Sequence, residues 1–399
     1  MIQELKFYVN VLSKGMKYRS HFLKQINYLI KKGKFRNAYN YIWDFTMSDE
    51  EGVGLLSPIY RRNPMLVPYP SRLELEPTNA CNLKCIKCEH TYWKEKEKKM
   101  TFEQFKYIID QFPHLKAISL TGIGHAFQGD NEVFKEEYLK MLRYLKSKQI
   151  FVQFFDPFLH INENLARELI KIGVDVIWMS IDGATKKTYN KLQINSDFDT
   201  VIKNVSTMIR LKKEMKSMFP EIHFHYIVQK LNVDEMPQFV DLINKITKDD
   251  PTDQRSIRFT RLIPFEKNLW LKPEVSDELI EETRKKISKS KNLFRIGFPL
   301  AEKKSPINCC TSWAVPFITV DGSVYPCCGF TELNKRSEVR KMLEPIFGNV
   351  FKKPFKEIWN SKQFKEFKIM IHNNQVPAVC NTFRECPAFA TGCIAKRKK

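Results

Sequence analysis

The chain has 399 residues, a mass of 47.2 kDa and a formal net charge of +21. Its 43% hydrophobic and 13% aromatic content supports a large core, which excludes a wholly disordered chain. No apolar run approaches the ~20 residues of a membrane-spanning helix, and lysines interrupt every N-terminal stretch that a signal peptide would need. We therefore expect a cytoplasmic protein, in which ten cysteines indicate metal or redox chemistry.

The positive charge is concentrated at the two ends of the chain. Residues 1–40 hold nine Lys or Arg and one Glu, and residues 396–399 are all basic. Basic ends can meet nucleic acid, an anionic membrane surface or an acidic partner, or they can simply keep the surface solvated. We do not expect nucleic acid to be a partner.

Residues 1–70 form a basic helical extension before the main domain. Apolar residues at helical spacing over 22–30 and 35–43 predict two amphipathic helices, and Gly33 ends the first. The many aromatic side chains favour a helical cap packed on the main domain. The alternative is a basic surface that docks on a membrane and makes the protein membrane-peripheral.

The region 71–300 alternates strand and helix patterns, which predicts parallel strands joined by right-handed crossovers. A barrel-like or a doubly wound sheet would satisfy the pattern, and either would bind ligands at the carboxyl ends of the strands. The expected strands are 72–76, 117–121, 150–155, 176–181, 222–228 and 257–262. The expected helices are 101–112, 132–147, 162–171, 199–215 and 234–247.

A loop with three cysteines follows the first expected strand. Cys81, Cys85 and Cys88 have the spacing C-x3-C-x2-C, which chance alone seldom produces in a chain with ten cysteines. Three thiolates cannot close a tetrahedral zinc site by themselves, and His90 is the alternative fourth ligand for zinc. Three thiolates can hold three irons of a [4Fe–4S] cluster and leave the fourth iron open to an external ligand.

Later strands end in segments that, together with this loop, resemble the motifs of one family. The segments are residues 119–124 (Ser-Leu-Thr-Gly-Ile-Gly), 180–184 (Ser-Ile-Asp-Gly-Ala) and 228–232 (Val-Gln-Lys-Leu-Asn). Over residues 72–265 the chain resembles radical S-adenosylmethionine (SAM) enzymes. The resemblance implies an α/β fold, a partial (βα)6 TIM-like barrel with an N-terminal helical extension and a small C-terminal iron–sulfur domain.

The resemblance also implies a mechanism. SAM would chelate the open iron of the [4Fe–4S] cluster, and one electron would cleave its C5′–S bond to give a 5′-deoxyadenosyl radical that abstracts hydrogen from a substrate. A flavodoxin- or ferredoxin-type partner would supply the electron. No catalytic residue is assigned beyond the cluster and the SAM site. The residues expected to contact SAM are Gly122, Gly124, His125, Ser180, Asp182, Gln229 and Asn232.

The chain departs from the family's usual pattern in four places along the sequence. His125 stands where a Glu normally binds the methionine ammonium, and a neutral imidazole would accept that hydrogen bond without charge assistance. The third strand ends in Asp156-Pro157 in place of Asn-Gly. Gln193 stands where an Arg is common, and Lys87 fills a usually hydrophobic position of the cysteine loop.

The other seven cysteines lie between residues 309 and 393 and resemble the SPASM/twitch domain, which holds auxiliary iron–sulfur clusters. Asp321-Gly322 predicts a hairpin turn that presents the cysteines after it. We expect one auxiliary [4Fe–4S] cluster, with a structural zinc site as the alternative. The expected ligands are Cys310, Cys327, Cys380 and Cys386, with Cys309, Cys328 and Cys393 as substitutes.

The sequence thus predicts three domains: a helical extension over 1–70, a radical SAM core over 71–300 and an auxiliary cluster domain over 301–399. The function that the resemblance implies is a radical SAM enzyme acting on a peptide or another biosynthetic intermediate. Two alternatives stay open at this point: a lipid- or membrane-facing radical SAM enzyme, and a non-catalytic iron–sulfur carrier.

Overall fold

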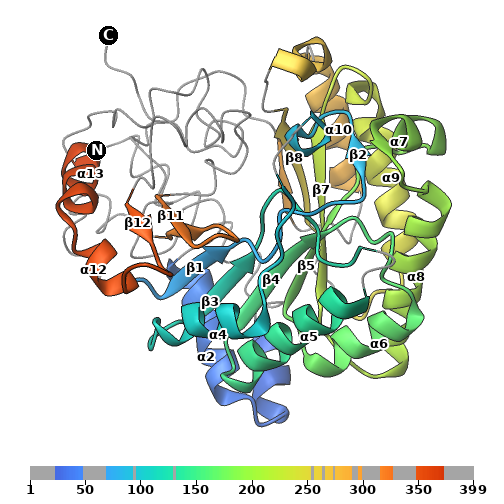
Figure 1. Ribbon diagram of the computed structural model, residues 1–399. Coiled ribbons are helices and arrows are strands. Elements are labelled where there is room, and N and C mark those ends of the chain that lie inside the picture. Colours follow the sequence, from blue (N-terminus) through green and yellow to red (C-terminus); the bar gives the residue numbers. More distant parts are fainter. Residues whose placement is uncertain are drawn as a thin grey trace, which may run out of the picture.

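The computed structural model describes residues 23–47, 69–92, 96–128, 132–252, 256–262, 266–272, 275–289, 295–298, 315–326 and 347–372. One curved ten-stranded sheet forms its centre, in the order β12-β11-β10-β1-β3-β4-β5-β7-β8-β9 (Figure 1). The strands from β1 to β9 in this order all pair in parallel. They are β1 (Arg72–Leu75), β3 (Ala117–Leu120), β4 (Phe151–Asp156), β5 (Val176–Ser180), β7 (Glu221–Val228), β8 (Ser256–Arg261) and β9 (Arg295–Gly297). All six expected strands and their parallel pairing are confirmed.

Helices pack along the outer face of this sheet (Figure 1). The five expected helices are confirmed to within two residues at each end: α4 (Phe102–Asp110), α5 (Glu132–Ser147), α6 (Glu163–Ile172), α8 (Phe198–Glu214) and α9 (Met236–Thr247). Local chemistry sets their ends, as in α6, where the Asn162 side chain accepts from Leu165 N at 3.1 Å and Gly173 ends the helix at φ +79°.

Within the region 71–300, two further described helices were not expected: α7 (Lys186–Leu192) and α10 (Asp277–Lys289). The residues of α10 are mostly charged, and Thr283 is its buried residue among those described. Its apolar residues Leu279 and Ile287 are partly buried against the core at helical spacing, but the many charged residues between them make this pattern easy to miss. None of the helices that the structure describes is long and apolar enough to cross a membrane.

The N-terminal helices cover the amino-terminal end of the barrel, as expected of a cap. Residues 23–31 are helical, Gly33 turns the chain at φ +69°, and α2 (Phe35–Met47) follows. Leu29, Ala38 and Tyr41 are buried in one cluster with the first residues of β3, β4 and β5. Burial of this face closes one end of the barrel and leaves the opposite end for ligands.

The sheet continues past β1 into the C-terminal part of the chain. β10 (Phe317–Ile318) pairs in parallel with β1, and β11 (Ser323–Tyr325) and β12 (Gly348–Asn349) follow antiparallel. The expected turn is confirmed, with Gly322 at φ +83° between β10 and β11. The helices α12 (Phe355–Trp359) and α13 (Lys362–His372) complete the described part. The ring of Phe355 packs 4.6 Å from that of Phe112, which joins this part to the barrel.

Candidate functional site

The cysteine loop leaves the carboxyl end of β1 and is held by segments that follow other strands. Its short strand β2 (Lys84–Cys85) pairs antiparallel with β6 (Gln193–Ile194), directly after α7. The side-chain amide of Asn268, in the 3-10 helix η4 (Glu266–Leu271), donates to the carbonyl of Lys87 at 3.0 Å. The fold therefore fixes the loop over the carboxyl ends of the strands, where ligands bind in α/β barrels.

The three thiols of this loop suit iron by their chemistry. Burial raises the pKa of Cys81 to about 12 and the pKa of Cys85 well above its usual value, and the charge of Cys88 raises both further. The thiols of Cys81 and Cys85 therefore keep their protons at neutral pH unless a bound cation displaces them. No three His, Cys, Asp or Glu side chains in the described ranges are arranged to surround a metal ion, so the fit rests on donor type and the shared loop. His90, the alternative zinc ligand, lies 3.7 Å from Glu97 through its Nε2.

Two glycines let the loop after β3 approach the chain just before Cys81. A Cβ atom at Gly122 would overlap the side chain of Glu76, and one at Gly124 would overlap the carbonyl of Ala80. The backbone N–H of the next residue, His125, donates to the same Ala80 carbonyl at 3.0 Å. These glycines therefore set the contact between the second-strand motif and the cysteine loop.

The His125 side chain lies beside the first cysteine. Its Nδ1 is 3.8 Å from Cys81 Sγ, and its Nε2 is 2.7 Å from the carbonyl of Phe127. Burial lowers the pKa of His125 to about 4, so the ring is neutral. Because a carbonyl only accepts, Nε2 carries the proton and Nδ1 keeps its lone pair. The ring stacks on His160 with centroids 6.1 Å apart.

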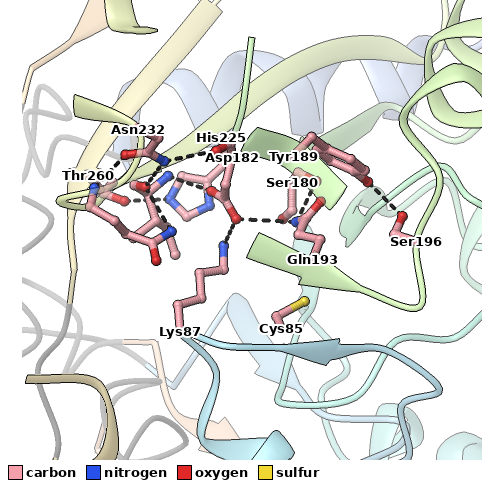
Figure 2. Close-up of polar contacts among 12 residues, drawn as sticks. Cys85, Lys87, Ser180, Asp182, Tyr189, Gln193, Ser196, His225, Asn232 and Thr260 are labelled. Atoms are coloured by element: carbon pink, nitrogen blue, oxygen red, sulfur yellow. Dashed lines mark hydrogen bonds and ion pairs between the residues drawn. The ribbon is translucent and has the colours of Figure 1, made fainter. Parts of the chain in front are cut away.

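Asp182, just after β5, accepts hydrogen bonds from several donors (Figure 2). Its Oδ1 accepts from the backbone of Ile227 at 2.8 Å, and its Oδ2 accepts from Gln193 Nε2 at 3.2 Å and pairs with the ammonium of Lys87. Its backbone carbonyl accepts from Asn232 Nδ2 at 2.9 Å. The carboxylate therefore links the cysteine loop to the ends of β5 and β7.

Two buried amide oxygens near this carboxylate have no hydrogen-bond partner among the described residues: Oε1 of Gln193 and Oε1 of Gln229. Unpaired buried acceptors are costly, and a bound ligand with donors, such as a nucleoside, would satisfy them. Asn232 differs, because its Oδ1 accepts from Gln229 N at 2.6 Å and its amide already donates to Asp182. Its described contacts therefore hold the backbone at Gln229 and Asp182 in place.

Contacts therefore join the ten core residues singled out from the sequence, directly or through their neighbours. They are Cys81, Cys85, Cys88, Gly122, Gly124, His125, Ser180, Asp182, Gln229 and Asn232. Their roles toward a cluster and SAM stay predictions. The seven C-terminal cysteines lie outside the described residues, so their expected roles also stay predictions: Cys309, Cys310, Cys327, Cys328, Cys380, Cys386 and Cys393.

Sequence reasoning missed two polar links at this site. Glu76 is fully buried and accepts from Ile123 N at 3.2 Å and Val320 N at 3.3 Å, which ties the second-strand loop to the C-terminal hairpin. A charged residue directly after a strand with alternating leucines was the available signal. The pair between Lys87 and Asp182 joins positions far apart in the sequence and left no local signal.

Comparison with known proteins agrees with this geometry. The family profile "Radical SAM superfamily" matches residues 75–243, and SPASM, "Iron-sulfur cluster-binding domain", matches residues 309–387. Mycofactocin maturase MftC of Mycolicibacterium smegmatis is 22% identical over 195 residues, which cover 49% of this chain and 45% of MftC. MftC of Mycobacterium tuberculosis is similar to the same extent. The match thus spans about half the length of these curated relatives.

Solved structures share the fold at low sequence identity. Streptococcus suis SuiB bound to S-adenosylmethionine has a TM-score of 0.58 and 14% identity, over 88% of this chain and 79% of SuiB. A histidine-tagged form of anSMEcpe with bound AdoMet has a TM-score of 0.53 and 17% identity, over 81% of this chain and 85% of that chain. These matches confirm the expected α/β fold class.

The two family profiles also confirm the expected classes of cofactor: SAM with a [4Fe–4S] cluster in the core, and auxiliary iron–sulfur in the C-terminal part. The SPASM match includes six of the seven C-terminal cysteines and ends before Cys393. The family expected from the cysteine loop is likewise confirmed. The chain therefore carries a domain of the radical SAM superfamily over residues 75–243 and a SPASM iron–sulfur domain over residues 309–387.

Proposed function

We propose that this protein is a radical SAM enzyme that modifies a peptide. The observation that carries the proposal is the three-cysteine loop, which the fold places over the carboxyl ends of parallel strands and beside the residues of the other SAM motifs. A cluster held by these three cysteines would supply the electron for cleavage of SAM and so start radical chemistry on a substrate bound at the same end of the barrel.

The chain's own residues bind and orient the cofactors in this proposal. Cys81, Cys85 and Cys88 bind three irons. His125 offers its Nδ1 lone pair to the methionine ammonium, consistent with its neutral ring. The buried side-chain oxygens of Gln193 and Gln229, which have no partner among the described residues, accept from the nucleoside. The N-terminal cap closes the far end of the barrel, which helps to exclude water from a reactive intermediate.

A peptide substrate is supported by what is known of similar proteins. MftC is named a mycofactocin maturase, SuiB has been solved bound to the precursor peptide SuiA, and anSMEcpe has been solved with AdoMet and the Cp18Cys peptide. We extend this substrate class to the present chain. A flavodoxin- or ferredoxin-type protein is the proposed electron donor.

We also propose the expected domain boundaries at residues 70 and 300 and one auxiliary [4Fe–4S] cluster. Its ligands are Cys310, Cys327, Cys380 and Cys386, with Cys309, Cys328 and Cys393 as substitutes. The β10–β11 hairpin supports this assignment, because Cys327 follows β11 closely in the chain. Two clusters predict about eight irons per chain after full reconstitution.

The N-terminal helices are proposed to act mainly as the cap, in a cytoplasmic protein. Burial of Leu29, Ala38 and Tyr41 beneath the barrel supports this role. The same helices expose Phe35 and Tyr39 among lysines, which is the observation in favour of peripheral membrane contact. Flotation with anionic vesicles separates the two: a protein that acts only as a soluble enzyme stays at the bottom of the gradient, and a membrane-bound one floats.

The experiment that tests the function is anaerobic reconstitution followed by incubation with SAM, a reductant and a short peptide encoded beside the gene. The proposal predicts 5′-deoxyadenosine and a peptide whose mass is changed. Full iron loading without 5′-deoxyadenosine would instead favour the non-catalytic carrier. Formation of 5′-deoxyadenosine with no change in any candidate peptide would uphold the radical chemistry and contradict the peptide substrate.

A further inference from the structure

The cysteine loop carries a cation between its second and third cysteines. Lys87 lies two residues after Cys85 and one before Cys88. Its ammonium pairs with Asp182, and the two side chains are 10% and 0% exposed. Figure 2 shows Lys87 rising from the loop toward this carboxylate. A positive charge is therefore held, largely out of water, beside the predicted cluster.

The pair is held at both ends. The side chain of Asn268 fixes the backbone carbonyl of Lys87 at 3.0 Å, and the backbone of Ile227 fixes Asp182 Oδ1 at 2.8 Å. A buried ion pair is costly unless its partners are well placed and hydrogen-bonded. The bond to Asp182 Oδ1 helps to satisfy the carboxylate, and the bond to the Lys87 carbonyl holds the backbone from which the ammonium extends.

Two departures from the family's usual residues meet at this carboxylate. Gln193, where an Arg is common, and Lys87, where an apolar residue is usual, both contact Asp182 Oδ2. The amide of Gln193 carries no charge, so the ammonium of Lys87 balances the carboxylate. The cation that faces Asp182 therefore comes from Lys87 of the cysteine loop, and Gln193 of β6 contributes a neutral amide.

The two charges act on the cysteine beside them. Lys87 lies two residues after Cys85 in the same loop. Cys85 pairs through its backbone with Gln193, whose side-chain amide donates to Asp182 at 3.2 Å. Both charges therefore lie close to a predicted iron ligand, and they have opposite signs.

We propose that Lys87 and Asp182 are a pair of positioning residues that set the reduction potential of the iron–sulfur cluster on the cysteine loop. Reduction adds negative charge to the cluster, so a nearby cation raises the potential and a nearby anion lowers it. Because both side chains are shielded from water, salt screens their effect less than that of exposed charges. The inference rests on the proposed function in one respect, namely that the loop binds the cluster.

The test is a redox titration of the reconstituted full chain, followed by electron paramagnetic resonance. The signal of this cluster is identified by its loss when Cys81, Cys85 and Cys88 are replaced by Ala. Lys87→Met should lower the midpoint potential, Asp182→Asn should raise it, and the double variant should return near the wild-type value. Lys87→Arg keeps the charge and should stay closest to wild type among the single variants at these positions.

Lys84→Met is the matched control, since Lys84 is a lysine of the same loop whose side chain is exposed. Its removal should shift the potential less than Lys87→Met, because water screens an exposed charge. Iron content and circular dichroism are recorded for every variant, and Lys87→Arg serves as the folded reference if Lys87→Met loses its cluster.

The outcomes separate the inference from the proposed function. Opposite shifts in the two single variants, with normal iron content, support the inference. Shifts in the same direction, no shift in either, or a shift in Lys87→Arg as large as that in Lys87→Met would overturn it and leave the cluster assignment intact. Wild-type protein that binds no iron on the cysteine loop would overturn both.

Discussion

At the scale of single residues, the site contains side chains that differ in type from the family's usual residues. His125 is the clearest case, because burial keeps its ring neutral and its Nε2 donates to the Phe127 carbonyl. A neutral ring can accept one hydrogen bond at Nδ1 but adds no charge to the site. The order of motifs in the sequence identified this position, whereas its tautomer depends on a carbonyl that only the fold brings near.

Replacing His125 with Glu should therefore keep or increase the affinity for SAM. A carboxylate gains a charge-assisted hydrogen bond to the methionine ammonium, worth about 1.5–3 kcal/mol before desolvation is subtracted. Anaerobic isothermal titration of SAM measures the change, with His125→Gln as the neutral control. If the Glu variant binds much more weakly than the Gln variant, His125 does not stand in for the missing carboxylate.

Asp156 gives a prediction about stability. Burial raises its pKa to about 8, and its Oδ1 accepts from Phe158 N at 2.7 Å. The folded state therefore favours the protonated form, whose stabilising contribution is present below pH ~4 and is lost as the pH rises toward 8. Asp156→Asn keeps the acceptor and cannot ionise, so it should raise the free energy of unfolding at pH 8 by about 2–5 kcal/mol.

Denaturant unfolding of the wild type and of Asp156→Asn at pH 5 and pH 8 checks this sign. The two proteins should differ more at pH 8 than at pH 5. A variant that is less stable than the wild type at pH 8 would show that the ionised carboxylate has a partner in the fold.

At the scale of elements, the parallel strands were predictable because their apolar residues occur in short runs or in alternation, and helical patterns lie between them. The pairing of β2 with β6 was not, because a two-residue strand has no periodicity to detect. Nor was the extension of the sheet by β10, since pairing with β1 joins segments more than two hundred residues apart. Local patterns therefore predict the barrel, while the contacts that fix the cysteine loop depend on the tertiary fold.

Gly124 tests the contact between two of these elements. A Cβ atom there would overlap the backbone carbonyl of Ala80, which cannot move aside cheaply. Gly124→Ala should displace the loop after β3 from the cysteine loop, lower stability by about 1–3 kcal/mol and weaken SAM binding.

The matched control is Gly297→Ala in β9, where the nearest atom to an added Cβ lies 3.6 Å away and leaves room. Thermal unfolding and SAM titration of both variants provide the measurement. If the two variants have the same stability and the same affinity for SAM, the close approach of the loop after β3 to the cysteine loop contributes to neither.

At the scale of the whole molecule, one sheet runs from the barrel into the C-terminal domain. Buried Glu76 accepts from the second-strand loop on one side and from Val320 of the hairpin on the other. The auxiliary cysteines come from segments far apart in the chain, so a cluster between them acts as a cross-link. Loss of that cluster should loosen the C-terminal domain and leave the barrel folded.

Cys327→Ala should accordingly lower the iron content by up to about four per chain and reduce the thermal stability of the C-terminal part by several kcal/mol. Iron analysis and hydrogen exchange measure the two effects, and the spectrum of the cluster near Cys81 should persist. If Cys327→Ala loses neither iron nor protection from hydrogen exchange, while Cys328→Ala loses both, the ligand is Cys328.

The loop of Cys81, Cys85 and Cys88 is proposed to hold the cluster at which SAM is cleaved. The most direct measurement is the iron content and 5′-deoxyadenosine yield of the variant in which all three are replaced by Ala, beside the reconstituted wild type. We expect a fall from about eight to about four irons per chain and complete loss of SAM cleavage. Unchanged iron content together with unchanged cleavage would contradict it.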